Sequence, residues 1–138
     1  MTDFTRLLNR GYTMMWREGR VDDALRGLGD DFEWVVPDHP EGAVRHGPDS
    51  VVEFFHEWVE PWEELEIEWD LEPAGPDAAL ATIDMRGRGR SSGAPAEMRF
   101  FQLWSFRDGR AVRMEMFHDL DDARRAAGLD LPPAPGAP

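Results

Sequence analysis

The chain has 138 residues, of which 41% are hydrophobic, and a formal net charge of −13. This length suits about one domain, and eight Phe and six Trp exclude an intrinsically disordered chain. The acidic balance argues against nucleic-acid and anionic-membrane partners, which need clustered Lys and Arg. The chain has no cysteine, which removes disulfides and thiolate chemistry. Because no apolar run is long enough to span a membrane and no signal peptide is evident, we expect a cytoplasmic protein.

Two helices are predicted at the start of the chain. Apolar residues recur at helical spacing from Phe4 to Trp16, and Gly19 ends this first helix. A second, shorter helix runs from Val21 to Leu28 and ends at Gly29.

One strand and a third helix follow. The strand covers residues 32–36 and stops at Pro37. A loop rich in Pro and Gly then carries at most a short strand near residues 43–46. The third helix has one apolar stripe, consisting of Val51, Phe54, Phe55, Trp58, Val59 and Trp62.

After this helix the apolar period changes from that of a helix to that of a strand. Residues 64–72 alternate acidic and apolar side chains, which predicts a half-buried strand. Residues 78–86 form the next strand, and a hairpin over residues 96–118 precedes a last helix that Gly128 ends. This order predicts an α+β domain over residues 1–129, with helices on one face of an antiparallel sheet. The Pro- and Ala-rich tail over residues 130–138 is expected to be disordered.

The turn at Asp108-Gly109 decides which side chains of the hairpin share a face. A two-residue turn pairs Arg107 with Arg110 and places Gln102 on the side of Glu115. A three-residue loop instead places Gln102 on a nearly apolar face. That face would hold Phe100, Gln102, Trp104, Val112, Met114, Met116 and His118. The sequence favours the second register because it buries more apolar surface.

Several segments together carry a resemblance to a known family. They are GRVDDALRGLGDDFEWVVP, RHGPDSVVEFF, GRGRSSG, FRDGRAVRMEMFHD and DARRAAGL. Over about residues 4–129 the chain resembles the SnoaL-like branch of the nuclear transport factor 2-like superfamily, whose relatives include polyketide cyclases and ketosteroid isomerase. The resemblance implies a cone-shaped, curved antiparallel sheet around three N-terminal helices, a short C-terminal helix and a pocket at the open end. It also implies a homodimer that pairs through the outer face of the sheet.

The resemblance transfers only part of a catalytic mechanism. Ketosteroid isomerase has a tyrosine on its first helix, an aspartate base after its first strand and a protonated aspartate in the sheet. The matching positions here are Tyr12, Val36 and Gln102. Valine cannot accept a proton, so this mechanism would need Asp38 or His39 from the next loop.

Polyketide cyclases carry an acidic residue on the last long strand. Glu115 is the nearest match here, but the favoured register turns it away from the apolar face. This orientation weakens a cyclase-like interpretation.

The leading hypothesis is a small hydrophobic molecule bound in the cone, with cofactor-free acid–base chemistry of an isomerase, cyclase or hydratase type. Tyr12 and Gln102 would hold a ligand oxygen, while His118, Asp38 or His39 would move protons. The rest of the binding wall would be Trp16, Trp34, Phe55, Trp58, Met85, Phe100, Trp104, Met114 and Met116. No histidine spacing indicates a metal site, so no metal or cofactor is expected.

Each polar candidate also has a structural explanation. His118 would anchor the cap of the last helix, and Tyr12 would be a core ring whose hydroxyl bonds to backbone. The alternative function is a non-catalytic homodimeric interaction module whose cone is plugged by its aromatic side chains.

Overall fold

The computed structural model describes residues 3–35 and 44–129. The predicted tail over residues 130–138 lies outside this range. The elements in chain order are α1 (Asp3–Tyr12), the π-helix η1 (Thr13–Arg17), α2 (Val21–Leu25), β1 (Leu28–Val35), β2 (Val44–His46), α3 (Pro48–Val59), β3 (Trp62–Pro73), β4 (Ala78–Gly89), β5 (Pro95–Arg107), β6 (Arg110–Phe117) and α4 (Leu120–Ala127). Among the helices of the described ranges, none has the length and apolar character that crossing a membrane requires.

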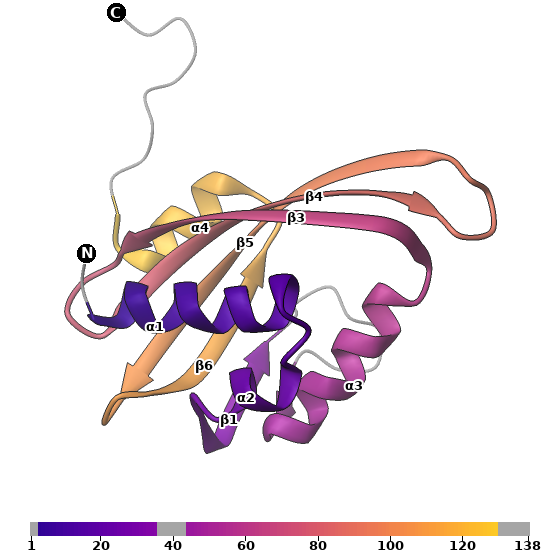
Figure 1. The fold of residues 1–138 in the computed structure, drawn as a ribbon. Coiled ribbons are helices and arrows are strands. Elements are labelled where there is room, and N and C mark those ends of the chain that lie inside the picture. Colours follow the sequence, from indigo (N-terminus) through magenta and orange to yellow (C-terminus); the bar gives the residue numbers. More distant parts are fainter. Residues whose placement is uncertain (1–2, 36–43, 130–138) are drawn as a thin grey trace, which may run out of the picture.

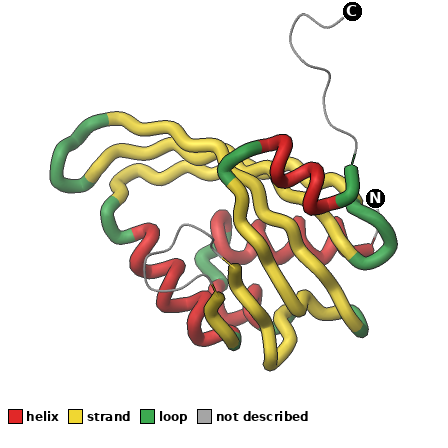
Figure 2. Tube along the Cα trace, turned by 180° about the vertical axis from the view of Figure 1, so that it is seen from behind, coloured by secondary structure: helices red, strands yellow, loops and turns green. Residues whose placement is uncertain are grey.

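One curved sheet organises the molecule. Its six described strands follow the order β2-β1-β6-β5-β4-β3. Helices α1, α2 and α3 lie on the concave side of the sheet, and α4 covers part of the convex side (Figures 1 and 2). The predicted α+β class, the curved sheet and the three N-terminal helices are therefore confirmed. The sheet is not wholly antiparallel, because β1 runs parallel to β6.

Three predicted helix ends differ from the structure. The first helix widens into the π-helical turn η1 before Gly19. The second helix ends at Leu25 instead of Leu28, because Leu28 pairs with Ala111 and begins β1. The third helix ends before Trp62, which starts β3, since the preceding Pro61 cannot continue a helix.

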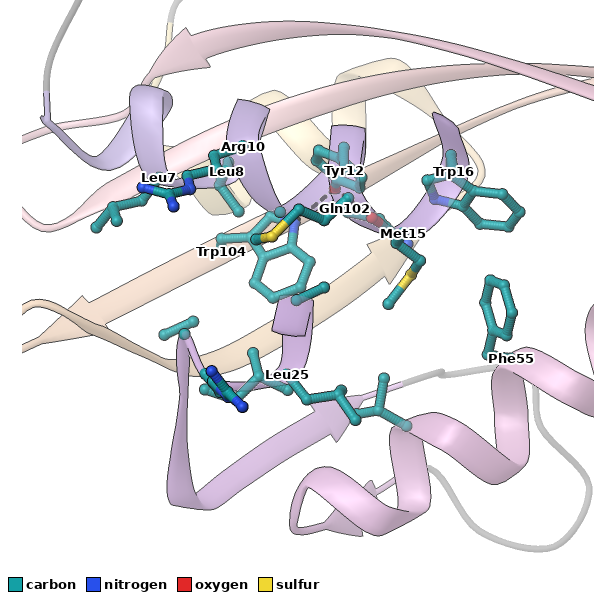
Figure 3. Close-up of a pocket in the computed structure, with 18 of the residues that line it drawn as sticks. Leu7, Leu8, Arg10, Tyr12, Met15, Trp16, Leu25, Phe55, Gln102 and Trp104 are labelled. Atoms are coloured by element: carbon teal, nitrogen blue, oxygen red, sulfur yellow. Dashed lines mark hydrogen bonds between the residues drawn. The ribbon is translucent and has the colours of Figure 1, made fainter. Parts of the chain in front are cut away.

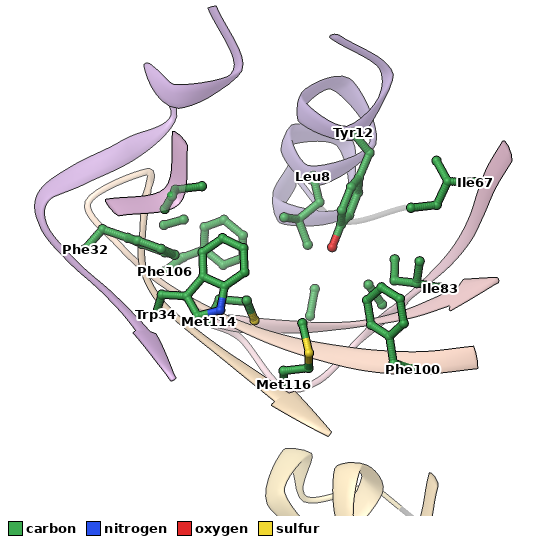
Figure 4. Close-up of a cluster of buried hydrophobic side chains, with 14 of the residues drawn as sticks. Leu8, Tyr12, Phe32, Trp34, Ile67, Ile83, Phe100, Phe106, Met114 and Met116 are labelled. Carbon is green, nitrogen blue, oxygen red and sulfur yellow. The ribbon is translucent and has the colours of Figure 1, made fainter. Parts of the chain in front are cut away.

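The main hydrophobic core lies between the helices and the concave face of the sheet (Figure 4). Tyr12 and Leu8 project into it from α1, and Phe32 and Met114 are fully buried in it. A second, smaller cluster joins Ala123 of α4 to Leu80 and Phe101 on the convex side. The two clusters explain why both faces of the middle strands are apolar.

The β5–β6 hairpin combines a tight turn with a bulge. Arg107 pairs with Arg110, and Asp108 and Gly109 have φ angles of 53° and 77°, which define a two-residue type I′ turn. Ser105 then pairs with Arg113 and Phe106 with Ala111, so that Val112 is the additional residue of a β-bulge. The predicted three-residue loop is therefore wrong.

The bulge nevertheless gives most of the predicted face. Gln102 pairs with Met116 and Trp104 with Met114, so these four side chains share one side of the hairpin. Ala111, which is buried, occupies the place on this face that was predicted for Val112. The bulge shifts the alternation by one residue, as the three-residue loop would have done.

The turn provides a stability test. Gly109→Ala should lower the free energy of unfolding by about 1 kcal/mol, because an L-residue is strained at this positive φ. The matched change Gly11→Ala lies in α1, where no atom beyond the chain neighbours and the helix's own backbone is within 4 Å of the added Cβ, and should raise it by about 0.5–1 kcal/mol. Urea denaturation measures both, and effects of the same sign would contradict this turn geometry.

Candidate functional site

A cavity of about 390 Å³ lies between the helices and the concave face of the sheet. Its wall comes from α1, η1, α2, α3 and the sheet strands (Figure 3). Most of this wall is apolar, with aromatic rings from Trp16, Phe55 and Trp104. A cavity of this size and character is typical of sites for small organic molecules.

Tyr12 reaches the cavity because of the spacing of apolar residues on α1. Leu8 and Tyr12 are four residues apart and therefore lie on one side of the helix, facing the sheet, and Met15 of η1 lines the same cavity. The ring of Tyr12 stacks on Trp69 at a centroid distance of 5.5 Å and meets the edge of Trp104 at 6.1 Å. These contacts bury the tyrosine, which is 7% exposed.

Two hydrogen bonds fix the Tyr12 hydroxyl. Nε1 of Trp104 donates to the hydroxyl oxygen at 2.8 Å, and the hydroxyl donates to Oε1 of Gln102 at 2.5 Å. An indole nitrogen can only donate, so the hydroxyl accepts from Trp104 and keeps its own proton for Gln102. This chain of donors joins α1 to β5 across the edge of the cavity.

The same chain determines how Gln102 presents its amide. Oε1 accepts a hydrogen bond from Tyr12, so Nε2 is the polar group of the Gln102 amide that this bond does not use. Gln102 lines the cavity, and its Nε2 forms no hydrogen bond to any residue within the described ranges. Two N–H donors of a side chain that is only 8% exposed are thus available to a ligand.

Burial raises the pKa of the Tyr12 phenol well above its ordinary value, and the hydrogen bond from Trp104 lowers it by a smaller amount. Desolvation disfavours the phenolate, which would be charged. Tyr12 is therefore a neutral hydrogen-bonding group near neutral pH and cannot act there as a phenolate base.

The cavity brings together eight of the predicted site residues: Tyr12, Trp16, Trp34, Phe55, Phe100, Gln102, Trp104 and Met116. Met85 and Met114 are buried in the core and do not line the cavity. His118 is exposed and likewise does not line it. Glu115 faces the other side of the hairpin and lies 3.5 Å from the guanidinium of Arg113.

Four residues named in the sequence analysis cannot be placed. Asp38 and His39 lie outside the described residues, as does Val36, and the side chain of Trp58 is also outside the description. Their predicted roles stay predictions. Within residues 3–35 and 44–129, no group of three His, Asp or Glu side chains could hold a metal ion.

The sequence did not indicate the charged part of the cavity wall. Four charged residues line it, namely Arg10, Arg20, Asp23 and Arg26. Arg10 follows Leu7 at helical spacing on one flank of α1, and this spacing was the signal in the sequence that could have indicated it. The sequence does not tell which flank of the helix borders the cavity, so an arginine at the cavity cannot be distinguished from one that only faces solvent.

The family model of the SnoaL-like domain matches residues 9–114. The chain belongs to the SnoaL-like family. The match begins in the last turn of α1 and reaches the middle of β6, and it includes Tyr12, Gln102 and Trp104. No curated protein matches this SnoaL-like chain.

Solved structures share its fold at low sequence identity. An NTF2-like protein of unknown function from Burkholderia pseudomallei is 22% identical, with a TM-score of 0.73 over 91% of this chain and 97% of that one. TerC, co-crystallised with polyporic acid, is 20% identical, with a TM-score of 0.71 over 92% and 99% of the two chains. A putative SnoaL-like polyketide cyclase from Jannaschia sp. is 18% identical, with a TM-score of 0.72 over 95% and 94%.

The raised pKa of Tyr12 can be measured directly. Tyr12 is the single tyrosine, and all 15 basic residues are arginine, so no lysine titrates in the same pH range. We expect the tyrosinate absorbance of the folded protein to appear well above pH 10, and that of the urea-unfolded chain near pH 10 (about the free value). Since the unfolded state ionises first, the stability that neutral Tyr12 contributes is fully present below about pH 10 and is lost above it.

Spectrophotometric titration and urea denaturation between pH 8 and 12 (roughly the range in which tyrosine and the α-amino group titrate) measure both effects. In Tyr12→Phe the loss of stability in this range should largely disappear. A folded protein that titrates at the same pH as the unfolded chain would disprove the burial of this hydroxyl.

Proposed function

We propose that this SnoaL-like protein binds a small, flat, largely apolar molecule in its cavity and holds an oxygen atom of that molecule with the Gln102 amide. The observation that carries the proposal is the pair of unused N–H donors of Gln102 in a wall that is otherwise mainly apolar. A ligand that offers only apolar surface would leave these donors unpaired.

Hydrogen-bond energetics favour a ligand with an acceptor. A ligand that covers the amide without accepting from it would leave a donor buried and unsatisfied at a cost of about 1–3 kcal/mol, and a ligand carbonyl or ether oxygen avoids this cost. Tyr12 fixes the amide in advance by donating to Oε1, so no reorientation is needed when the ligand binds. The site is therefore suited to a carbonyl-bearing aromatic or polycyclic compound.

The volume of the cavity supports an open binding site over the plugged interaction module. About 390 Å³ remains after the aromatic side chains are packed, which is within the range of ligand sites. TerC, a protein of the same fold, was crystallised with the small molecule polyporic acid. The homodimer through the outer sheet face stays a prediction.

In this proposal the Gln102 amide binds and polarises a ligand carbonyl, and other residues would have to transfer protons. Asp23 is the only carboxylate among the described lining residues, and it is paired with Arg20 at 2.9 Å and Arg26 at 3.4 Å. Isomerase- or cyclase-type chemistry would thus need a base from outside the described residues, for which Asp38 and His39 are the predicted candidates.

The dye prodan, a neutral naphthalene with a ketone, tests the proposal. We expect saturable binding, with a blue shift of its emission as the dye leaves water for the apolar cavity. Gln102→Leu should weaken binding about 3- to 10-fold, which corresponds to the loss of one neutral hydrogen bond. Fluorescence titration measures both quantities.

Two further variants control this test. Ala24→Phe places a ring into the lined space and should abolish binding, whereas Met98→Leu, on an exposed side chain that does not line the cavity, should have no effect. Thermal unfolding shows whether each variant is folded. Equal binding by the wild type and Ala24→Phe would exclude the cavity as the site, and equal binding by Gln102→Leu would exclude the amide as the donor.

A further inference from the structure

The charged residues of the cavity wall come from one region, the mouth between α1 and α2. Arg10 belongs to α1, Asp23 to α2, and Arg20 and Arg26 flank α2. The three arginines are exposed, whereas Tyr12 and Gln102 are buried. Figure 3 shows Arg10 beside Leu7 on α1, with Leu25 on the facing segment. We call Arg10, Arg20 and Arg26 the rim arginines.

The rim is positive on a strongly negative protein. Three arginines and one aspartate give it a formal charge of +2, against −13 for the whole chain. Asp23 contacts Arg20 and Arg26, and Glu18 contacts Arg20 at 3.2 Å. Arg10 has no carboxylate partner within the described ranges. A guanidinium without a partner next to an apolar cavity is an available site for an anion.

The position of Arg10 on its helix connects it to the cavity. Leu7 and Arg10 are three residues apart and therefore lie on one flank of α1, and both line the cavity, as does Met14 of η1. Leu7 is 44% exposed, which makes it unusual among the large apolar side chains. An apolar ligand that enters along this flank would cover Leu7 and place its outer end at Arg10.

We propose that the ligand is an apolar acid whose carboxylate binds at Arg10, with Arg26 as the second cation, while its apolar body occupies the cavity. This inference rests on the proposed function and adds the class of the ligand. Arginine suits the role because its planar fork can bind both oxygens of a carboxylate. The net charge of the chain repels acids generally, so the rim arginines provide the local attraction that an acidic ligand needs.

Competition against prodan with two ligands of the same shape tests the inference. Biphenyl-4-carboxylate and biphenyl-4-carboxamide differ in charge, and at low ionic strength the acid should displace prodan at about three- to fivefold lower concentration. Added salt should reduce this preference, because the rim is exposed to solvent.

Arg10→Gln should bring the ratio of the two affinities, acid over amide, to about one. Both competitors are measured against prodan in the same variant, so that any change in prodan binding itself cancels in this ratio. Arg125→Gln removes the same charge from α4, whose helix packs on the convex side of the sheet, and should keep the preference. This control separates a local contact from an effect of net charge.

The possible results distinguish the two proposals. If acid and amide displace prodan equally, the inference of an acidic ligand is wrong, and the cavity remains the proposed site. The inference is also wrong if Arg10→Gln keeps the preference for the acid. Failure of both compounds to displace bound prodan also overturns it. If prodan itself does not bind, the proposed function fails first, and this inference fails with it.

Discussion

The one-way hydrogen bonding of an indole determines the polar layout of this protein. Because Trp104 can only donate, the Tyr12 hydroxyl must accept from it, and the hydroxyl proton is directed at Gln102. The helical layer is thereby tied to the sheet at a place where the cavity prevents continuous apolar packing. Stacked and edge-on rings keep the hydroxyl dry, which strengthens both hydrogen bonds. The amide of Gln102 is oriented as a result of this chain, before any ligand arrives.

Local patterns in the sequence were sufficient for the class of fold and insufficient for its register. Helical and alternating apolar periods identify the helices on the concave side and the acidic face of β3. Asp108-Gly109 indicates a turn, but turn chemistry is silent about the bulge two residues further on. The bulge depends on contacts that are distant in sequence: Ala111 is buried, and its N–H donates to the carbonyl of Gly27 at 2.9 Å. The parallel pairing of β1 with β6 is of the same kind, since neither strand alone specifies its partner.

The part of the candidate site that is also part of the hydrophobic core could be predicted from the sequence. Aromatic residues and Gln102 on an apolar face point to a wall, whatever its exact shape. The contact between Tyr12 and Gln102 joins residues 90 positions apart, and no periodicity predicts it. The rim arginines could not be predicted in this way, because exposed charges on α1 and at the ends of α2 have the same sequence pattern as ordinary solvated side chains. His118 was placed near the cavity by strand alternation, which does not tell where along the strand the cavity ends.

The extra residue Val112 changes the alternation of side chains along β6. On the turn side of the bulge the odd-numbered Ala111 shares the face of Gln102, and beyond the bulge the even-numbered Met114 and Met116 share it. The bulge makes this change within a single residue. Turn length can therefore vary among related chains while the inward set of side chains is kept, provided that the bulge compensates. The bulge itself is therefore dispensable for this choice of side chains. Losing the codon of Val112 would leave Ser105 opposite Arg113 and Trp104 opposite Met114, so that a regular hairpin would present the same apolar side chains on the face of Gln102.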